Sequence, residues 1–80
     1  VFFIAGKACQ SSGELKKAIE IFDRAISHYG LNIYLLNSVG ECHFQLGQLD
    51  EAKAAWQKSL EIDPNQPSIK KSVEALKEKR

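Results

Sequence analysis

The side chains of this chain that could do nucleophilic or acid–base chemistry do not form a recognisable catalytic set. Ser27 stands next to His28, but no G-x-S-x-G context and no orienting acid accompany the pair. The acidic pair Asp50-Glu51 falls where a helix is expected to begin, and the helix dipole accounts for it there. The chain also lacks an H-E-x-x-H motif, a P-loop and a G-x-G-x-x-G motif. We therefore expect no enzymatic activity and no bound cofactor.

The two cysteines, Cys9 and Cys42, do not form the C-x₂-C spacing of a zinc site. A thiol–imidazole pair of Cys42 and His43 is disfavoured, because adjacent residues of a helix point in different directions. Free cysteine commonly packs as a small buried hydrophobic residue. We expect both thiols to be reduced, free of metal and packed against a neighbouring helix.

Length and composition limit the classes of protein to be considered. Eighty residues make one small domain, and 44% hydrophobic with 26% charged residues is typical of a globular chain. A net charge of +1 favours neither nucleic acid nor an anionic membrane, and no apolar run is long enough to span a bilayer. Because the chain contains no methionine, we expect it to be a segment of a longer protein.

The elements that would position any site follow from an internal repeat. Residues 6–26 and 40–60 match at an offset of 34, the distance from Gly13 to Gly47. The other matched pairs are Gly6 with Gly40, Leu15 with Leu49, Ala18 with Ala52, Phe22 with Trp56, and Ile26 with Leu60. A period of this length indicates stacked copies of one supersecondary unit.

The repeated residues follow a known pattern, W-x₂-L-G-x₂-Y…A-x₃-F…P. The second copy reads Leu36-x₂-Val39-Gly40-x₂-His43, then Ala52-x₃-Trp56, then Pro64, and the first reads Phe2-x₂-Ala5-Gly6-x₂-Cys9, then Ala18-x₃-Phe22. The chain therefore resembles the tetratricopeptide repeat family over residues 1–66. It departs from the pattern at Cys9 and His43, which replace tyrosine, and at Gly30, which replaces the first proline.

The resemblance implies an all-α fold in which helical hairpins stack into a short right-handed α-solenoid. We expect a single domain, 1–80, made of a truncated first repeat (1–31), a second repeat (32–66) and a C-terminal capping helix (67–80). The apolar spacing predicts helices over 1–11, 14–29, 33–45 and 68–79, and a fourth helix from Leu49 that ends before Pro64. Asn32 is the expected N-cap of the third helix.

Each predicted helix has an apolar stripe that is expected to face the core. In the first helix the stripe contains Phe2, Ala5, Gly6 and Cys9, and in the fourth it contains Leu49, Ala52, Trp56, Leu60 and Ile62. Gly40 costs about 1 kcal/mol relative to alanine inside a helix. We interpret it as the point of closest approach of the paired helix, and Gly6 in the same way.

In the family, the first helix of each pair lines a concave surface that takes a peptide or helix of another protein. The resemblance implies a partner-binding groove formed by Phe3, Lys7, Tyr34, Asn37, Ser38, Glu41, Phe44, Gln45 and Lys71. Alternatively, Phe3 and Phe44 only pack against a neighbouring helix or against a repeat that this chain lacks. Some members hold a C-terminal carboxylate with basic residues, but here Phe3 and Lys7 replace the lysine and asparagine required, and Glu41 would repel the carboxylate.

The expected function is therefore a protein–protein interaction module. A groove that mixes amides with aromatic rings suits an extended or helical segment. The alternative is a structural segment of a longer solenoid, or a unit that self-associates through its truncated first helix. The last helix carries five basic and two acidic residues from Lys70 to Arg80, a local charge of +3, which fits a solvated cap or a contact for an acidic partner.

Overall fold

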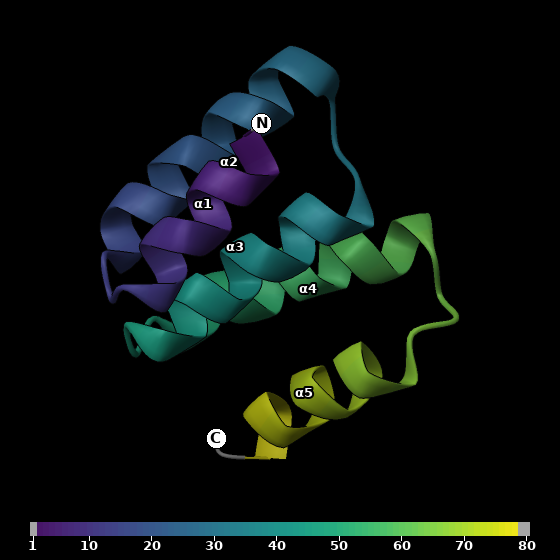
Figure 1. Ribbon diagram of the computed structural model, residues 1–80. Helices are drawn as coiled ribbons and strands as arrows, with labels where there is room; N and C mark the ends of the chain where they lie inside the picture. The colour runs from purple at the N-terminus through teal and green to yellow at the C-terminus, as the bar shows by residue number, and fades with distance from the viewer. Residues whose placement is uncertain (1, 79–80) are drawn as a thin grey trace.

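The computed structural model describes residues 2–78, with side chains from residue 4 to residue 77. This part of the chain contains five α-helices and no strand: α1 (Phe2–Ser11), α2 (Leu15–Tyr29), α3 (Ile33–Gln45), α4 (Leu49–Ile62) and α5 (Pro67–Glu78). Each helix packs against the next along the chain, so that α1 and α2 form one hairpin, α3 and α4 a second, and α5 lies along α4 (Figure 1). The all-α fold of stacked hairpins expected from the repeat is confirmed.

The turns inside the two hairpins have the same hydrogen bonds at an offset of 34 residues. The N–H of Glu14 donates to the carbonyl of Cys9 at 2.9 Å, and the N–H of Gln48 donates to the carbonyl of His43 at 2.8 Å. The residue before each donor is a glycine with positive φ, 89° at Gly13 and 81° at Gly47. This is the Schellman arrangement, which requires a left-handed residue at that position.

The start of α3 is also as expected. The Asn32 side-chain oxygen accepts a hydrogen bond from the N–H of Leu35 at 2.9 Å. This bond satisfies one of the backbone donors that a helix N-terminus leaves open.

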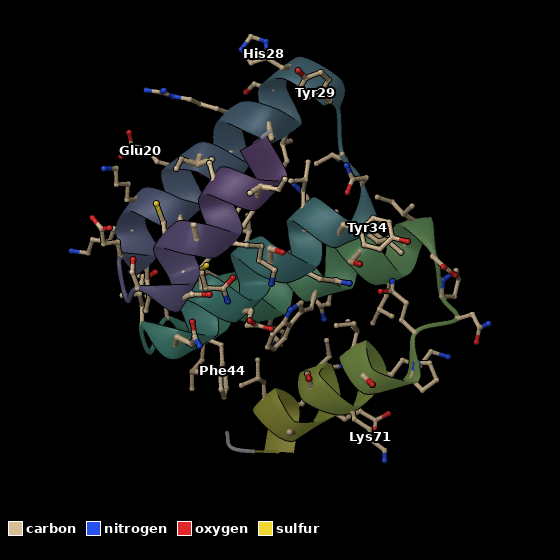
Figure 2. All side chains as sticks on the ribbon, viewed as in Figure 1. Glu20, His28, Tyr29, Tyr34, Phe44 and Lys71 are labelled. Carbon is tan, nitrogen blue, oxygen red and sulfur yellow. The ribbon has the colours of Figure 1, made fainter. Side chains whose placement is uncertain are left out.

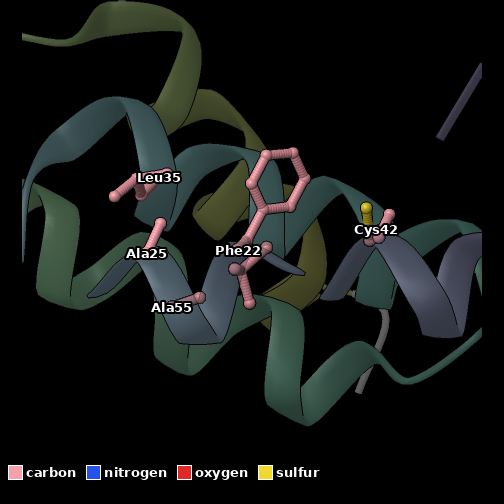
Figure 3. Close-up of a cluster of buried hydrophobic side chains, with 7 residues drawn as sticks. Phe22, Ala25, Leu35, Cys42 and Ala55 are labelled. Atoms are coloured by element: carbon pink, nitrogen blue, oxygen red, sulfur yellow. The ribbon is translucent and has the colours of Figure 1, made fainter. Parts of the chain in front are cut away.

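The core is divided into two clusters by α4. The larger one joins α2, α3 and α4 through Ala18, Phe22, Ala25, Leu35, Val39, Cys42 and Ala55, and Cys9 of α1 packs against it (Figure 3). The smaller one joins α4 to α5 through Ala52, Trp56, Val73 and Leu76. Because α5 is held mainly by the smaller cluster, the position of α5 depends on few side chains.

The expected close approach at the two helical glycines is confirmed, but the neighbouring group is a ring rather than backbone. A Cβ on Gly40 would lie 2.6 Å from Cδ1 of Trp56, and a Cβ on Gly6 would lie 2.6 Å from Cζ of Phe22. These distances are well inside van der Waals contact. Each glycine therefore makes room for the aromatic residue of its own hairpin.

Two of the residues expected to face inward from α4 are exposed. Leu49 and Ile62 are 37% and 51% exposed, whereas Ala55 and Ser59 are buried. The buried stripe of α4 is centred on Ala52, Trp56 and Ser59, so Leu49 and Ile62 fall on its margins. They are also the first and last residues of the helix, where its neighbours cover it least.

The stripe expected on α1 is correct only in part. Gly6 is buried and Cys9 is half-buried, but Ala5 is exposed, and the side chain of Phe2 lies outside the described residues. Val39, the residue 34 positions after Ala5, belongs to the core cluster that α2 completes. No described helix takes the place of α2 beside Ala5, so Ala5 remains open to solvent.

Candidate functional site

Two adjoining cavities lie between α3 and α5, with Trp56 of α4 in the wall of both. The Tyr34 cavity, of about 380 Å³, is lined by Lys7, Tyr34, Asn37, Ser38, Glu41, Trp56, Ser68, Ile69 and Ser72. The Phe44 cavity, of about 310 Å³, is lined by Glu41, Phe44, Trp56, Ser72, Ala75 and Leu76. They share Glu41, Trp56 and Ser72, and we call the pair the α3–α5 groove. Figure 2 shows Tyr34 and Phe44 at the two ends of α3.

Most of the groove residues expected from the sequence line these cavities. Lys7, Tyr34, Asn37, Ser38, Glu41 and Phe44 do so. Gln45 is exposed but lines neither cavity, and Lys71 lies on the side of α5 turned away from α3 (Figure 2). The side chain of Phe3 is outside the described residues.

Ser38 differs from the expectation that it stands on the exposed side of its helix. It is 5% exposed. It therefore forms part of the wall of the Tyr34 cavity without standing out into the groove.

Sequence reasoning assigned Lys71 of α5 to the groove but missed the α5 residues Ser68, Ile69 and Ser72. Ser68, Ile69 and Ser72 complete the Tyr34 cavity, and Ser72 also reaches the Phe44 cavity. Continuing the 34-residue offset would have found two of them, since Ser68 corresponds to Tyr34 and Ser72 to Ser38.

A polar chain connects α1 to the middle of the groove. Lys7 donates from Nζ to Oε1 of Gln10 at 3.4 Å, and Gln10 donates from Nε2 to Oε1 of Glu41. The amide of Gln10 thus presents its oxygen to the cation and its nitrogen to the carboxylate. Glu41 itself is exposed, so its carboxylate faces both the groove and solvent.

The side chain of Asn37 is largely engaged by its own chain. Its Nδ2 donates to Oε1 of Gln66 at 2.9 Å. The orientation of the Gln66 amide is set by three acceptors for its Nε2: the carbonyl of Asp63 at 2.8 Å, and the carbonyl and hydroxyl of Ser59, each at 3.1 Å. Asn37 Oδ1 is left buried without a hydrogen-bond partner.

Two aromatic rings meet at the Phe44 end of the groove. The ring centroids of Phe44 and Trp56 are 5.9 Å apart with planes inclined by 39°, which is a favourable range for an aromatic pair. Trp56 is 6% exposed and Phe44 is 44% exposed. The indole Nε1 also donates to the backbone carbonyl of Asn37 at 3.4 Å, which ties α4 to α3. Phe44 is therefore the more accessible of the two rings.

Two titratable groups in the described part of the chain, Cys42 and Asp23, have raised pKa values. Burial and the nearby Glu41 carboxylate raise the pKa of the Cys42 thiol, with Lys7 opposing them. Burial raises the pKa of Asp23, and His43 opposes it.

Within the part of the chain that the structure describes, no three His, Cys, Asp or Glu residues group so as to hold a metal ion. The helices described there are also too short or too polar to cross a membrane.

Comparison with known protein families agrees with the repeat read from the sequence. A model of the tetratricopeptide repeat matches residues 33–66, and a second model of the same repeat matches residues 1–27. No curated protein matches the chain.

Proposed function

The chain belongs to the tetratricopeptide-repeat family, whose repeats generally mediate protein–protein interaction, and on that premise we propose that it binds a peptide or helical segment of a partner protein in the α3–α5 groove. The observation that carries this proposal is the pair of adjoining cavities that share Trp56. Tyr34 and Phe44, at either end, are 69% and 44% exposed. Exposed aromatic residues beside a concave surface are typical anchors of an interface.

The length of the groove limits the segment that it can take. Tyr34 and Phe44 are ten residues apart in α3, or about 15 Å at a rise of 1.5 Å per residue. An extended peptide covers that distance with about four or five residues. The contact is smaller than a standard interface of about 800 Å² per partner, so we expect modest affinity.

The second candidate function, self-association, is favoured by a different surface. Ile4 is 74% exposed, and the neighbouring Ala5 and Ala8 of α1 are exposed as well. A second copy of the chain could cover this apolar side of α1. Sedimentation separates the two functions, because self-association through α1 is lost in Ile4→Glu while a groove ligand still binds.

To obtain ligands for testing the groove, a library of displayed peptides is screened for binding to the 80-residue chain. The affinity of each selected peptide is then measured for the parent chain, for Phe44→Ala and for Lys16→Ala, in which the altered residue is exposed on α2. We expect Phe44→Ala to weaken binding about fivefold or more, equivalent to about 1 kcal/mol, with unchanged helicity. Lys16→Ala should bind like the parent. Peptides that bind both variants as tightly as the parent would place the binding surface elsewhere, and the basic α5 would be the next surface to test.

A further inference from the structure

The chemistry of the Phe44 cavity specifies the kind of ligand, on the basis of the proposed use of the groove. We propose that this cavity receives an arginine side chain of the partner segment, with the guanidinium against the Glu41 carboxylate and the aliphatic stem against Phe44 and Trp56. The partner is then a protein segment that combines arginine with apolar residues.

Charge is the first argument. Of the described residues that line the Phe44 cavity, Glu41 alone is ionisable. The lysine of the groove, Lys7, lines the Tyr34 cavity, and Lys70, Lys71 and Lys77 of α5 line neither cavity. A single carboxylate in a mostly apolar wall attracts a cation and disfavours an anion.

The hydrogen bonding of Glu41 leaves capacity for this contact. Gln10 donates one hydrogen bond to Oε1 of the carboxylate. An ionised carboxylate has about four acceptor positions and can accept two parallel bonds from one guanidinium. The bond from Gln10 also holds the carboxylate in place, because Gln10 is itself bonded to Lys7.

The remaining walls favour arginine over other cations. They are the rings of Phe44 and Trp56, the side chains of Ala75 and Leu76, and the Ser72 hydroxyl. A guanidinium is planar and weakly hydrated and stacks on aromatic rings, whereas the ammonium of lysine is compact and strongly hydrated. The cavity, at about 310 Å³, has roughly ten times the volume that one molecule occupies in liquid water, so it admits a whole side chain.

Matched tripeptides test this directly. Acetyl-Leu-Arg-Leu-amide is compared with the same peptide carrying citrulline, which has the shape of arginine without its charge, and with one carrying glutamate. Trp56 is the single tryptophan of the chain and lines the cavity, so its fluorescence and its indole N–H resonance report binding at the site. We expect the arginine peptide to bind the parent at least fivefold more tightly than the citrulline peptide, and the glutamate peptide to bind most weakly.

The variant Glu41→Gln keeps the size of the side chain and removes its charge. We expect it to abolish the preference for arginine over citrulline while leaving the affinity for the citrulline peptide unchanged. The matched control is Glu20→Gln, because Glu20 lies on α2 away from α5 (Figure 2) and is exposed. It should keep the full preference, which excludes a general effect of net charge.

The outcomes separate this inference from the proposed function. The inference is overturned if the citrulline or glutamate peptide binds as tightly as the arginine peptide, or if Glu41→Gln keeps the preference. It is also overturned if Trp56 responds to library-selected peptides but not to the arginine peptide. If Trp56 responds to none of these peptides, the proposed function of the groove fails as well.

Discussion

The indole ring of Trp56 occupies the space that a side chain on Gly40 would need. A Cβ on Gly40 would lie 2.6 Å from Cδ1 of the ring, and Phe22 stands in the same relationship to Gly6. In both hairpins the glycine comes 16 positions before the aromatic residue. The most distinctive residue pair of the repeat is therefore a direct contact, in which an aromatic ring of the second helix lies on the glycine of the first.

This contact predicts the effect of Gly40→Leu. Overpacking against Trp56 should cost about 1–3 kcal/mol or more, although leucine alone would favour a helix by roughly 1 kcal/mol over glycine. We expect a net loss of stability in urea unfolding. Gln45→Leu, at an exposed position of the same helix, serves as the control and should change stability little. A variant with leucine at position 40 that unfolds at higher urea than the parent would contradict the packing described here.

Trp56→Ala should largely unfold the domain. Trp56 is 6% exposed and belongs to the cluster that holds α5. Loss of a buried aromatic side chain costs about 3–5 kcal/mol, which is a large part of a stability near the lower end of about 5–15 kcal/mol. Thermal unfolding followed by circular dichroism measures the effect, with Tyr34→Ala as an exposed control. A melting temperature within a few degrees of the parent would be incompatible with this position for Trp56.

Gln66→Ala should loosen α5 from the rest of the molecule. The Gln66 amide donates to Ser59 and Asp63 and accepts from Asn37, so its removal leaves several polar groups unpaired. We expect a cost of about 1–3 kcal/mol. Hydrogen exchange should show the loss of protection mainly in α5, with Gln57→Ala on the exposed side of α4 as the control. If the amides of α5 were as protected from exchange in Gln66→Ala as in Gln57→Ala, the Gln66 hydrogen bonds would not hold α5 in place.

We expect ionisation of the Cys42 thiol to lower the stability of the protein at high pH. Burial and Glu41 raise its pKa above the usual 9.0, so the folded state keeps the proton longer than the unfolded state does. The contribution of the protonated thiol to the free energy of unfolding is complete below the pKa of the thiol in the unfolded state. It is lost as the pH rises towards the higher pKa of the folded state. Above about pH 9 the parent should therefore lose stability more steeply than Cys42→Ala. Parallel slopes for the two proteins would contradict this assignment.

Thiol labelling of the native chain tests the burial of Cys42 separately. Cys42 is 0% exposed, whereas Cys9 is only half-buried. We expect Ellman's reagent to modify Cys9 first and Cys42 only as the protein unfolds, and to find two free thiols per chain in denaturant. Equal rates for the two thiols in the native protein would show that the core around Cys42 opens readily.

The 34-residue repeat, by itself, determined the helices and their turns. The expected spans of α2, α3 and α5 match the structure to within about one residue, and Asn32 is the N-cap of α3. The positive φ of Gly13 and Gly47 and the burial of Phe22 and Trp56 were also predictable. These features depend on residues within one turn of each other, or on one hydrophobic stripe, and such relationships can be read directly along the chain.

The sequence predicted most of the groove residues on α1 and α3, but only the tertiary structure showed how α4, α5 and the loop before α5 complete the groove. Trp56 lines both cavities beside α5, whereas its counterpart Phe22 is 0% exposed and lines neither. Gln66 engages Asn37 from the loop before α5. These outcomes depend on how far apart two helices pack and on which side chains reach between them. Helical periodicity sets the direction of a side chain but not the distance to its neighbour, so the two cavities between α3 and α5 could not be predicted from spacing alone.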